Sequence, residues 1–483
     1  MNTTLTETPV TPKARTKRRS WLCRCALISS DLLALFSAFL ISQSLSSMPT
    51  SYVTFARDGV IFLTLTVVCL ILFLIKGHYQ KRLPFWDELR QIIKAIVLVA
   101  LLHAAFLVLL QLTPSRLGFI SAWIFALALV PTMRLLCKST LLHFGWWRYP
   151  TVIIGDGENA ADTARALAGE RMMGYDVTHF VSIDQPKQRY MNIRGKTLPV
   201  IQMSETPEEQ FAGMDYPHIV VALERGGLDR IQHYVDRLNL FYPRLSIVPA
   251  LRGLPLFGTD MHHFFSHEVI MLNVRNNLNP FLNRVIKRSF DIVVSILLLL
   301  LLSPLFAFVS MKIKKSGGTA IFAHSRVGRD GKVFPCLKFR SMVPNAQEVL
   351  EKLLEQDPEA RAEWNKDFKL KNDPRVTPIG HFLRKTSLDE LPQLWNVLRG
   401  EMSLVGPRPV IAEEVERYGE QAVYYLQAKP GMTGLWQVSG RSDIDYDSRV
   451  YLDAWYVKNW SLWTDIVILI STIKVVLHRD GAY

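Results

Sequence analysis

The chain has 483 residues, 49% of them hydrophobic, which excludes one small soluble domain and favours several domains, some of them embedded in lipid. Its formal net charge of +13 suits an anionic membrane surface, phosphorylated substrates or nucleic acid, so charge alone does not choose among these partners. The five cysteines are scattered, without a CxxC pair or histidines at zinc spacing, which is typical of a reducing compartment and indicates no structural metal.

Four apolar stretches before residue 140 each approach the roughly 20 residues that a helix needs to cross a bilayer. They lie at about residues 21–46, 59–76, 91–111 and 117–137. Lys and Arg collect before the first stretch, between the second and third, and after the fourth, as on cytoplasmic flanks. We predict a cytoplasmic basic tail over residues 1–20, retained as part of an anchor, and a four-helix transmembrane bundle over 21–140. Core helices of a large soluble protein are the alternative.

The next segment, residues 149–270, alternates short apolar strands with amphipathic stretches, which predicts a Rossmann-like cytoplasmic α/β domain. Thr151–Ile154 reads as a strand that runs through a glycine turn at Gly155–Ala160 into a helix, and residues 218–222 read as a further strand. No acidic residue for a ribose follows at the expected distance. We therefore favour a structural or regulatory domain over a working dinucleotide site.

A fifth apolar run, Ile292–Met311, has basic residues on both sides, which argues against a simple crossing. Pro304 within it removes a helical hydrogen bond, and Ser303 can satisfy the carbonyl that this frees. We predict a re-entrant helix over residues 291–311 that returns to the cytoplasmic side. The alternative, a kinked spanning helix, would place everything after it in the periplasm.

The last third is rich in cations beside glycine and proline, in loops that can present Arg and backbone amides to phosphate. Within it, Ser387 and Glu390 have the spacing of a capping box. Pro392 argues against that reading and predicts a helix that starts near Pro392 and ends at Gly400. Asp389 and Glu390 would precede this helix, where its dipole favours an ionised Asp389 and where Mg²⁺ could bridge two carboxylates.

Three motifs in this order, Lys338–Met342, Thr386–Gln393 and Gly406–Pro409, resemble those of the bacterial polyprenyl-phosphate hexose-1-phosphate transferases, the monotopic sugar transferase superfamily. The resemblance covers residues 283–483 as a monotopic catalytic domain. The whole chain, with its bundle and middle domain, is similar to the undecaprenyl-phosphate galactose phosphotransferase branch.

The resemblance implies that Asp389 attacks the β-phosphorus of a UDP-hexose, releases UMP and passes the phosphosugar to undecaprenyl phosphate. Asp389 and Glu390 would be the catalytic pair and the ligands of Mg²⁺. The resemblance also implies the break at Ser303 and Pro304. Basic residues that would bind substrate phosphates are Lys338, Arg340, Arg384, Arg408 and Arg441, with Asp453 as a further candidate.

The implied place is the bacterial inner membrane, with the catalytic domain on its cytoplasmic face and in contact with membrane lipid. UDP-glucose in place of UDP-galactose is one alternative, and a non-enzymatic membrane scaffold with a nucleotide-binding domain is another. A nucleic-acid partner is not expected, because no nucleic-acid module is recognisable. A homodimer fits an anchored chain of this size, although the sequence does not show one. Trp455, Tyr456, Trp460 and Trp463 suit either a membrane interface or an ordinary packed helix.

Overall fold

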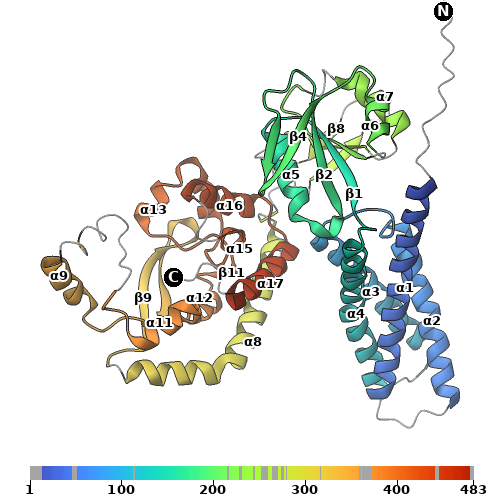
Figure 1. Cartoon of the computed structure of the whole chain (residues 1–483). Helices are drawn as coiled ribbons and strands as arrows, with labels where there is room; N and C mark the ends of the chain where they lie inside the picture. Colours follow the sequence, from blue (N-terminus) through green and yellow to red (C-terminus); the bar gives the residue numbers. More distant parts are fainter. Residues whose placement is uncertain are drawn as a thin grey trace, which may run out of the picture. The chain divides into compact units, whose positions relative to one another are not determined.

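The computed structural model describes residues 14–45, 52–112, 115–214, 217–227, 231–242, 245–251, 259–263, 270–273, 277–278, 280–315, 317–357, 361, 373–440 and 445–478. The chain divides into two compact units, Met1–Arg252 and Gly253–Tyr483, and each is described by itself (Figure 1).

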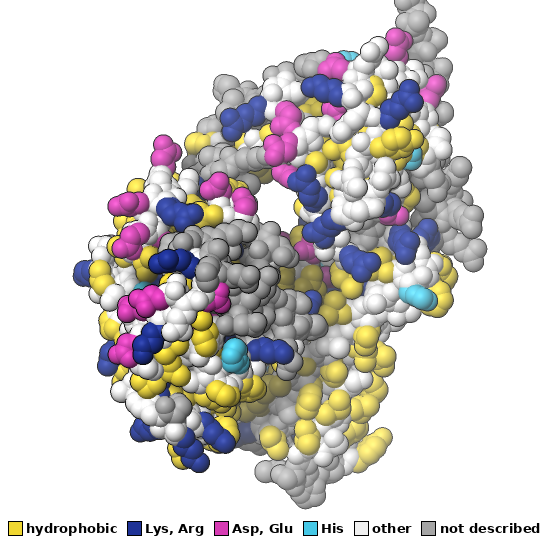
Figure 2. Space-filling view, turned by 60° about the vertical axis from the view of Figure 1, so that its left-hand side comes forward, with side chains coloured by type: hydrophobic (Ala, Val, Ile, Leu, Met, Phe, Trp, Pro, Cys, Tyr) yellow, Lys and Arg dark blue, Asp and Glu magenta, His cyan; other side chains and the backbone are white. Residues whose placement is uncertain are grey.

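Four long helices open the first unit: α1 (Ala14–Leu45), α2 (Tyr52–Ile75), α3 (Phe85–Leu109) and α4 (Arg116–His143). Each coincides with one of the four predicted apolar stretches, although α1, α2 and α3 end one or two residues before the predicted ends. Among the described residues, these helices and α8 of the second unit are long and apolar enough to cross a membrane. The surface over α1–α4 is largely hydrophobic in the space-filling view, and charged side chains gather away from it (Figure 2). These helices indicate a membrane protein.

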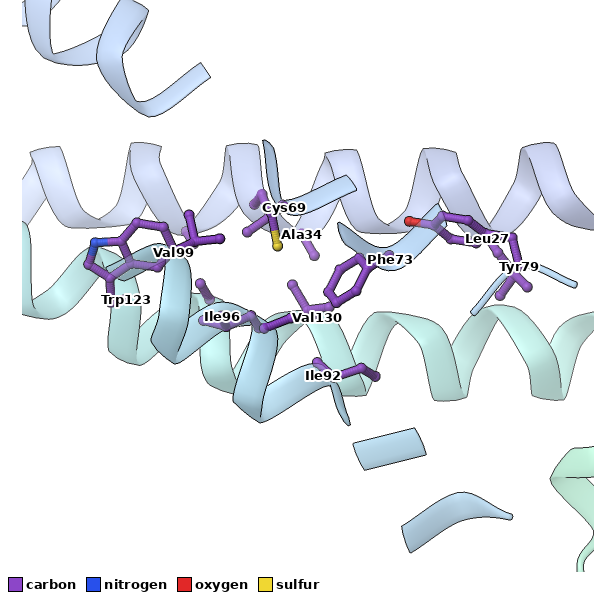
Figure 3. Close-up of a cluster of buried hydrophobic side chains, with 14 of the residues drawn as sticks. Leu27, Ala34, Cys69, Phe73, Tyr79, Ile92, Ile96, Val99, Trp123 and Val130 are labelled. Carbon is purple, nitrogen blue, oxygen red and sulfur yellow. The ribbon is translucent and has the colours of Figure 1, made fainter. Parts of the chain in front are cut away.

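The four helices share one apolar core. Figure 3 shows side chains from all four helices meeting there, among them Leu27, Ala34, Phe73, Ile96 and Val130, and each of these five is at most 1% exposed. The opposite faces carry exposed leucines such as Leu33, Leu63 and Leu101. Helices that are apolar on both their inner and outer faces suit a lipid environment.

A buried network of charged side chains ties these helices together. The Arg134 guanidinium donates to both carboxylate oxygens of Asp31, at 2.8 and 2.6 Å, and to Glu88 at 3.2 Å. The Lys138 ammonium pairs with the other oxygen of Glu88, and the Tyr79 hydroxyl donates to Asp31 at 2.6 Å. Charges in an apolar setting are stable only when they are paired and hydrogen-bonded, as these are.

A six-stranded sheet in the order β3-β4-β2-β1-β5-β6 completes the first unit. Its strands are β1 (Tyr149–Ile154), β2 (Tyr175–Ser182), β3 (Tyr190–Ile193), β4 (Lys196–Gln202), β5 (His218–Val221) and β6 (Leu245–Ile247). All neighbouring strands are parallel except β3 and β4. Helix α5 (Glu158–Gly169) packs on one face, and α6 (Pro207–Gly213) and α7 (Gln232–Phe241) pack on the other. The predicted strand, glycine turn and helix, and the strand near residue 218, are confirmed.

The second unit is built on α8 (Phe281–Lys314) and several short elements. Its strands are β7 (Asp260–His263), β8 (Ile270–Asn273), β9 (Ile321–Val327), β10 (Val333–Phe339), β11 (Ser403–Val405) and β12 (Gly431–Thr433). Its helices include α9 (Ala346–Gln356), α11 (Pro378–Lys385), α12 (Gln393–Arg399), α13 (Ala412–Glu416), α14 (Ala422–Gln427), α15 (Leu435–Val438), α16 (Tyr446–Lys458) and α17 (Leu462–His478). In the described part of this unit the strands form two-stranded sheets: β7-β8 and β9-β10 are antiparallel, and β11-β12 is parallel.

Helix α8 changes direction along its length and contains Pro304 (Figure 1). Proline lacks an N–H and leaves the carbonyl four residues earlier, that of Leu300, without its helical donor. The Ser303 hydroxyl donates to this carbonyl at 2.8 Å, which confirms the predicted role of Ser303. The outer face of α8 exposes Leu300, Leu301 and Phe308, as a lipid-facing helix would.

The aromatic residues near the carboxyl end include two that belong to the packed interior. Tyr456 and Trp460 are 1% and 3% exposed, and both donate to the buried Asp465 carboxylate, at 2.7 and 3.1 Å. Lys287 of α8 donates to the same carboxylate at 2.7 Å. For these two aromatic residues the packed-helix alternative is therefore correct, and the network fixes α8 to the helices of the second unit.

Candidate active site

Asp389 and Glu390 lie in a single 3-10 turn, η4 (Leu388–Glu390), just before α12. Ser387 has a left-handed backbone (φ 55°) and makes no side-chain cap, so the capping box does not form. Helix α12 has Pro392 as its N-cap and ends at Gly400, whose φ of 85° suits glycine. The prediction of a helix that follows the two carboxylates is confirmed.

Lys338 of strand β10 joins the carboxylate pair. Its Nζ donates to Glu390 Oε1 at 2.6 Å and lies 3.9 Å from Asp389 Oδ2. Arg384, in the last turn of α11, donates from Nε to the Ser341 hydroxyl at 3.0 Å, and its charge acts on Asp389. The structure therefore brings together four of the predicted site residues, two acidic and two basic.

The environment of Asp389 differs from the one expected from the helix dipole. Its side chain is only 15% exposed. The pKa of Asp389 is raised to about 6, with burial as the largest cause; the Lys338 and Arg384 charges oppose this rise, and the Glu390 charge adds to it. Desolvation therefore outweighs the expected effect of the helix dipole on the pKa of Asp389, yet at a pKa of about 6 the carboxylate is still largely ionised at neutral pH.

Arg340 has a different setting from Lys338. It is buried, and its guanidinium donates to the carbonyl oxygens of Ile313, at 3.4 Å, and of Gly317. These carbonyls lie at the end of α8 and just beyond it. Arg340, which directly follows β10, thus holds the carboxyl end of α8 against the strand that carries Lys338. The predicted contact of Arg340 with a substrate phosphate stays a prediction.

Arg408 and Asp453 lie close to each other at the Gly406–Pro409 loop. Arg408 is exposed, with its guanidinium carbon 5.7 Å from the centre of the Trp436 ring. Asp453 of α16 is buried and accepts a hydrogen bond from the Tyr418 hydroxyl at 3.0 Å. Burial raises the pKa of Asp453 to about 7, although Tyr418 and the Arg408 backbone and charge lower it. The fifth predicted basic residue, Arg441, lies outside the described residues.

Sequence reasoning missed Asn396. The helical spacing of Leu391, Leu394, Trp395 and Leu398 suggests an apolar face that includes Trp395. In the structure Trp395 is 49% exposed, while Asn396 is completely buried. A polar residue within a short helical pattern does not reveal its own burial. Asn396 bonds to the strand that carries Lys338.

The carboxylate pair fits a magnesium ion only together with a substrate. Within the described ranges, no group of three or more His, Cys, Asp or Glu side chains could hold a metal. Mg²⁺ commonly binds through one or two carboxylates and completes its shell with substrate phosphates and water. Asp389 and Glu390 supply that number of carboxylates, although Lys338 neutralises Glu390 in this structure.

A carboxylate of the protein, that of Glu224, occupies the helix start at the glycine turn of the α/β domain. Glu224 follows β5, and its carboxylate accepts a hydrogen bond at 2.7 Å from the backbone N–H of Asn159, at the start of α5. The Asn159 side chain donates to the carbonyls of Leu223 and Val248 at 2.9 and 3.0 Å. Such a helix start is where nucleotide phosphates bind in related folds. The structural or regulatory role of this domain stays a prediction.

Comparison with known proteins identifies the class. The family model described as bacterial sugar transferase matches residues 282–479. An undecaprenyl-phosphate galactose phosphotransferase of Salmonella typhimurium is 51% identical over 421 residues, 87% of either chain. A UDP-galactose-lipid carrier transferase of Erwinia amylovora is 48% identical over 87% of either chain. A UDP-glucose:undecaprenyl-phosphate glucose-1-phosphate transferase of Escherichia coli is 36% identical over 52% of this chain and 48% of that one. The chain is an enzyme that belongs to the bacterial sugar transferase family.

Proposed function

We propose that this enzyme transfers galactose 1-phosphate from UDP-galactose to undecaprenyl phosphate and releases UMP. The observation that carries the proposal is the largely buried Asp389, which lies beside Glu390 and Lys338 just before α12 and feels the charge of Arg384. The choice of galactose rests on the relatives named for it, which match most of the chain. Such a transfer would be the first membrane step of O-antigen, capsule or exopolysaccharide synthesis.

The reaction would proceed in two displacements at phosphorus. In the first, a carboxylate oxygen of Asp389 attacks the β-phosphorus of UDP-galactose, an acyl–phosphate bond forms, and the bond to the UMP oxygen breaks. In the second, an oxygen of undecaprenyl phosphate attacks the same phosphorus and the carboxylate leaves. A covalent intermediate divides one difficult transfer into two easier ones.

Cations around the pair would stabilise the charge that builds up on the phosphoryl oxygens and on departing UMP. Lys338 and Arg384 are next to Asp389, and Arg408 is exposed on its loop for a phosphate contact. Asp389 and Glu390 would hold Mg²⁺, which when bound would supply further positive charge at the diphosphate. We extend the phosphate-binding role to Arg340 and Arg441.

The direct test is to purify the enzyme in nanodiscs with undecaprenyl phosphate and to measure UMP release from separate UDP-sugars. UMP release from UDP-galactose, much faster than from UDP-glucose, is expected. Faster release from UDP-glucose would reject galactose and keep the reaction. No UMP from any UDP-hexose would reject the reaction itself and favour a scaffold role.

The pH dependence follows from the pKa of Asp389. Because burial raises that pKa to about 6, and only the ionised carboxylate attacks, kcat/KM should fall about tenfold per pH unit below about pH 6. The Lys338 charge lowers the pKa of Asp389, so Lys338→Met should move this acid limb to higher pH. The measurement is initial UMP release from pH 4.5 to 8, and an unmoved limb in the variant would contradict the assignment.

We further propose that the catalytic unit lies on the cytoplasmic face of the inner membrane and that α8 is re-entrant. The support is the Ser303–Pro304 break with its satisfied Leu300 carbonyl, and the basic residues at both ends of the apolar run. A helix that dips into one leaflet would place Asp389 at the level of the lipid phosphate.

Cysteine labelling in intact cells tests this topology. With an impermeant maleimide, Lys332→Cys, at an exposed position after α8, should label only after the cells are opened. Arg116→Cys, exposed at the start of α4 and on the predicted outer side, should label in intact cells and is the matched control. Labelling of position 332 in intact cells would reject the re-entrant helix and support a full crossing.

A further inference from the structure

Asn396 is completely buried, and every polar atom of its side chain is hydrogen-bonded. Its Oδ1 accepts from the Leu337 amide at 3.0 Å, and its Nδ2 donates to the Pro335 carbonyl at 2.7 Å. Nδ2 also donates to Glu401 Oε2 at 2.6 Å. A single side-chain amide thus connects α12, strand β10 and the segment after α12.

The two backbone groups that Asn396 contacts belong to the same edge of β10. Residues 335 and 337 are two apart in the strand, so their N–H and C=O groups point to the same side. On that side, the Asn396 side-chain amide makes the two hydrogen bonds that a backbone peptide group of a neighbouring strand would make. Strand β9 pairs with the opposite edge, so β10 is held from both sides.

This contact lies next to the proposed chemistry on both elements. Leu337 directly precedes Lys338, whose Nζ reaches Glu390 at 2.6 Å and Asp389 at 3.9 Å. Asn396 is in the helix that begins right after that carboxylate pair. The amide therefore fixes the spacing between the backbone that carries the cation and the backbone that carries the carboxylates.

We propose that Asn396 is a positioning residue for phosphosugar transfer, because its buried amide locks β10 against α12 and so sets Lys338 opposite Asp389 and Glu390. The proposal rests on the proposed function. Asn396 does not touch substrate and takes no part in bond making. Its effect passes through the position of the Lys338 ammonium.

The test uses the isosteric change Asn396→Asp in the full-length enzyme. The new carboxylate oxygen would face two acceptors, the Pro335 carbonyl and the Glu401 carboxylate, and would push the strand away. Turnover of UDP-galactose should fall about 100-fold, as a misplacement near 1 Å does. Because the effect passes through Lys338, the same change made in a Lys338→Met enzyme should cost little further turnover.

Two further variants separate positioning from a general loss of packing. Adding Glu401→Gln to Asn396→Asp gives the new carboxylate an amide donor in place of the Glu401 carboxylate, and should recover part of the rate. Asn459→Asp is the control at another buried asparagine of the same unit, whose Nδ2 donates to the Trp455 carbonyl. It should lower the thermal midpoint, and any loss of turnover should be the same in the unaltered and the Lys338→Met enzymes.

The outcomes distinguish this inference from the proposed function. If the unaltered enzyme turns over and Asn396→Asp costs the same factor in turnover in the Lys338→Met enzyme, or if Glu401→Gln recovers nothing, the positioning role is rejected. If the cost of Asn459→Asp also disappears in the Lys338→Met enzyme, the effect is general loosening and the inference is also rejected. If the unaltered enzyme releases no UMP from any UDP-hexose, the proposed function fails instead.

Discussion

Replacing Asp389 by asparagine should lower sugar-phosphate transfer by roughly 10⁴-fold or more and should leave no phosphosugar on the protein. An amide is nearly the same size as the carboxylate but is a poor nucleophile at phosphorus. Glu390 is bonded to Lys338 at 2.6 Å, so it is not free to replace Asp389 in the attack. The loss should therefore appear in the first half-reaction, before the lipid acceptor takes part.

Mass spectrometry of the intact enzyme, incubated with UDP-galactose and no lipid acceptor, measures this directly. The unaltered protein should gain the mass of a hexose phosphate and lose it when undecaprenyl phosphate is added. Asp330→Asn is the matched control, because Asp330 is exposed in a turn whose left-handed backbone (φ 58°) asparagine tolerates. Normal turnover by Asp389→Asn would remove Asp389 as the nucleophile.

Replacing Arg134 by methionine should destabilise the first unit by about 3–5 kcal/mol, because Asp31 and part of Glu88 would lose their buried partner. The Asp31 side chain is completely buried, so water cannot take over the lost hydrogen bonds. The expected result is a clearly lower thermal midpoint in detergent and a lower yield of folded protein.

Two companion variants make this test specific. Arg57→Met removes an arginine whose side chain is 38% exposed and pairs with the adjacent Asp58, so it should change stability by less than about 1 kcal/mol. Adding Asp31→Asn to Arg134→Met removes the stranded charge, leaves the Glu88–Lys138 pair in place, and should recover part of the loss. Equal midpoints for Arg134→Met and Arg57→Met would show that the network contributes little.

The features predicted correctly from the sequence are those set by local chemistry. Pro392 and Gly400 fix the two ends of α12 through their backbone preferences, without help from distant residues. The pairing of Ser303 with the carbonyl freed by Pro304 is also local, since three residues in one turn determine it. Such arguments depend only on spacing along the chain.

The features that escaped prediction depend on residues far apart in sequence. The pKa of Asp389 is set mainly by burial, and burial comes from packing of α11, η4 and β10. The Asn396 side chain is hydrogen-bonded to backbone groups about 60 positions earlier in the sequence. Asp31 of α1 forms its ion pair with Arg134 of α4. Spacing along the chain contains no signal for contacts of this kind.

Arg288 of α8 donates to the carbonyl oxygens of Val397 and Leu398, at 2.5 and 2.7 Å, in the last turn of α12. The carboxylates lie at the other end of that short helix, so one rigid connection runs from the apolar helix to Asp389. A change in the tilt or depth of α8 would therefore be transmitted to the reacting carboxylate. On the proposed function and topology, bilayer thickness would become a variable of the chemistry, since it would set the height at which Asp389 meets a phosphate anchored by its lipid tail.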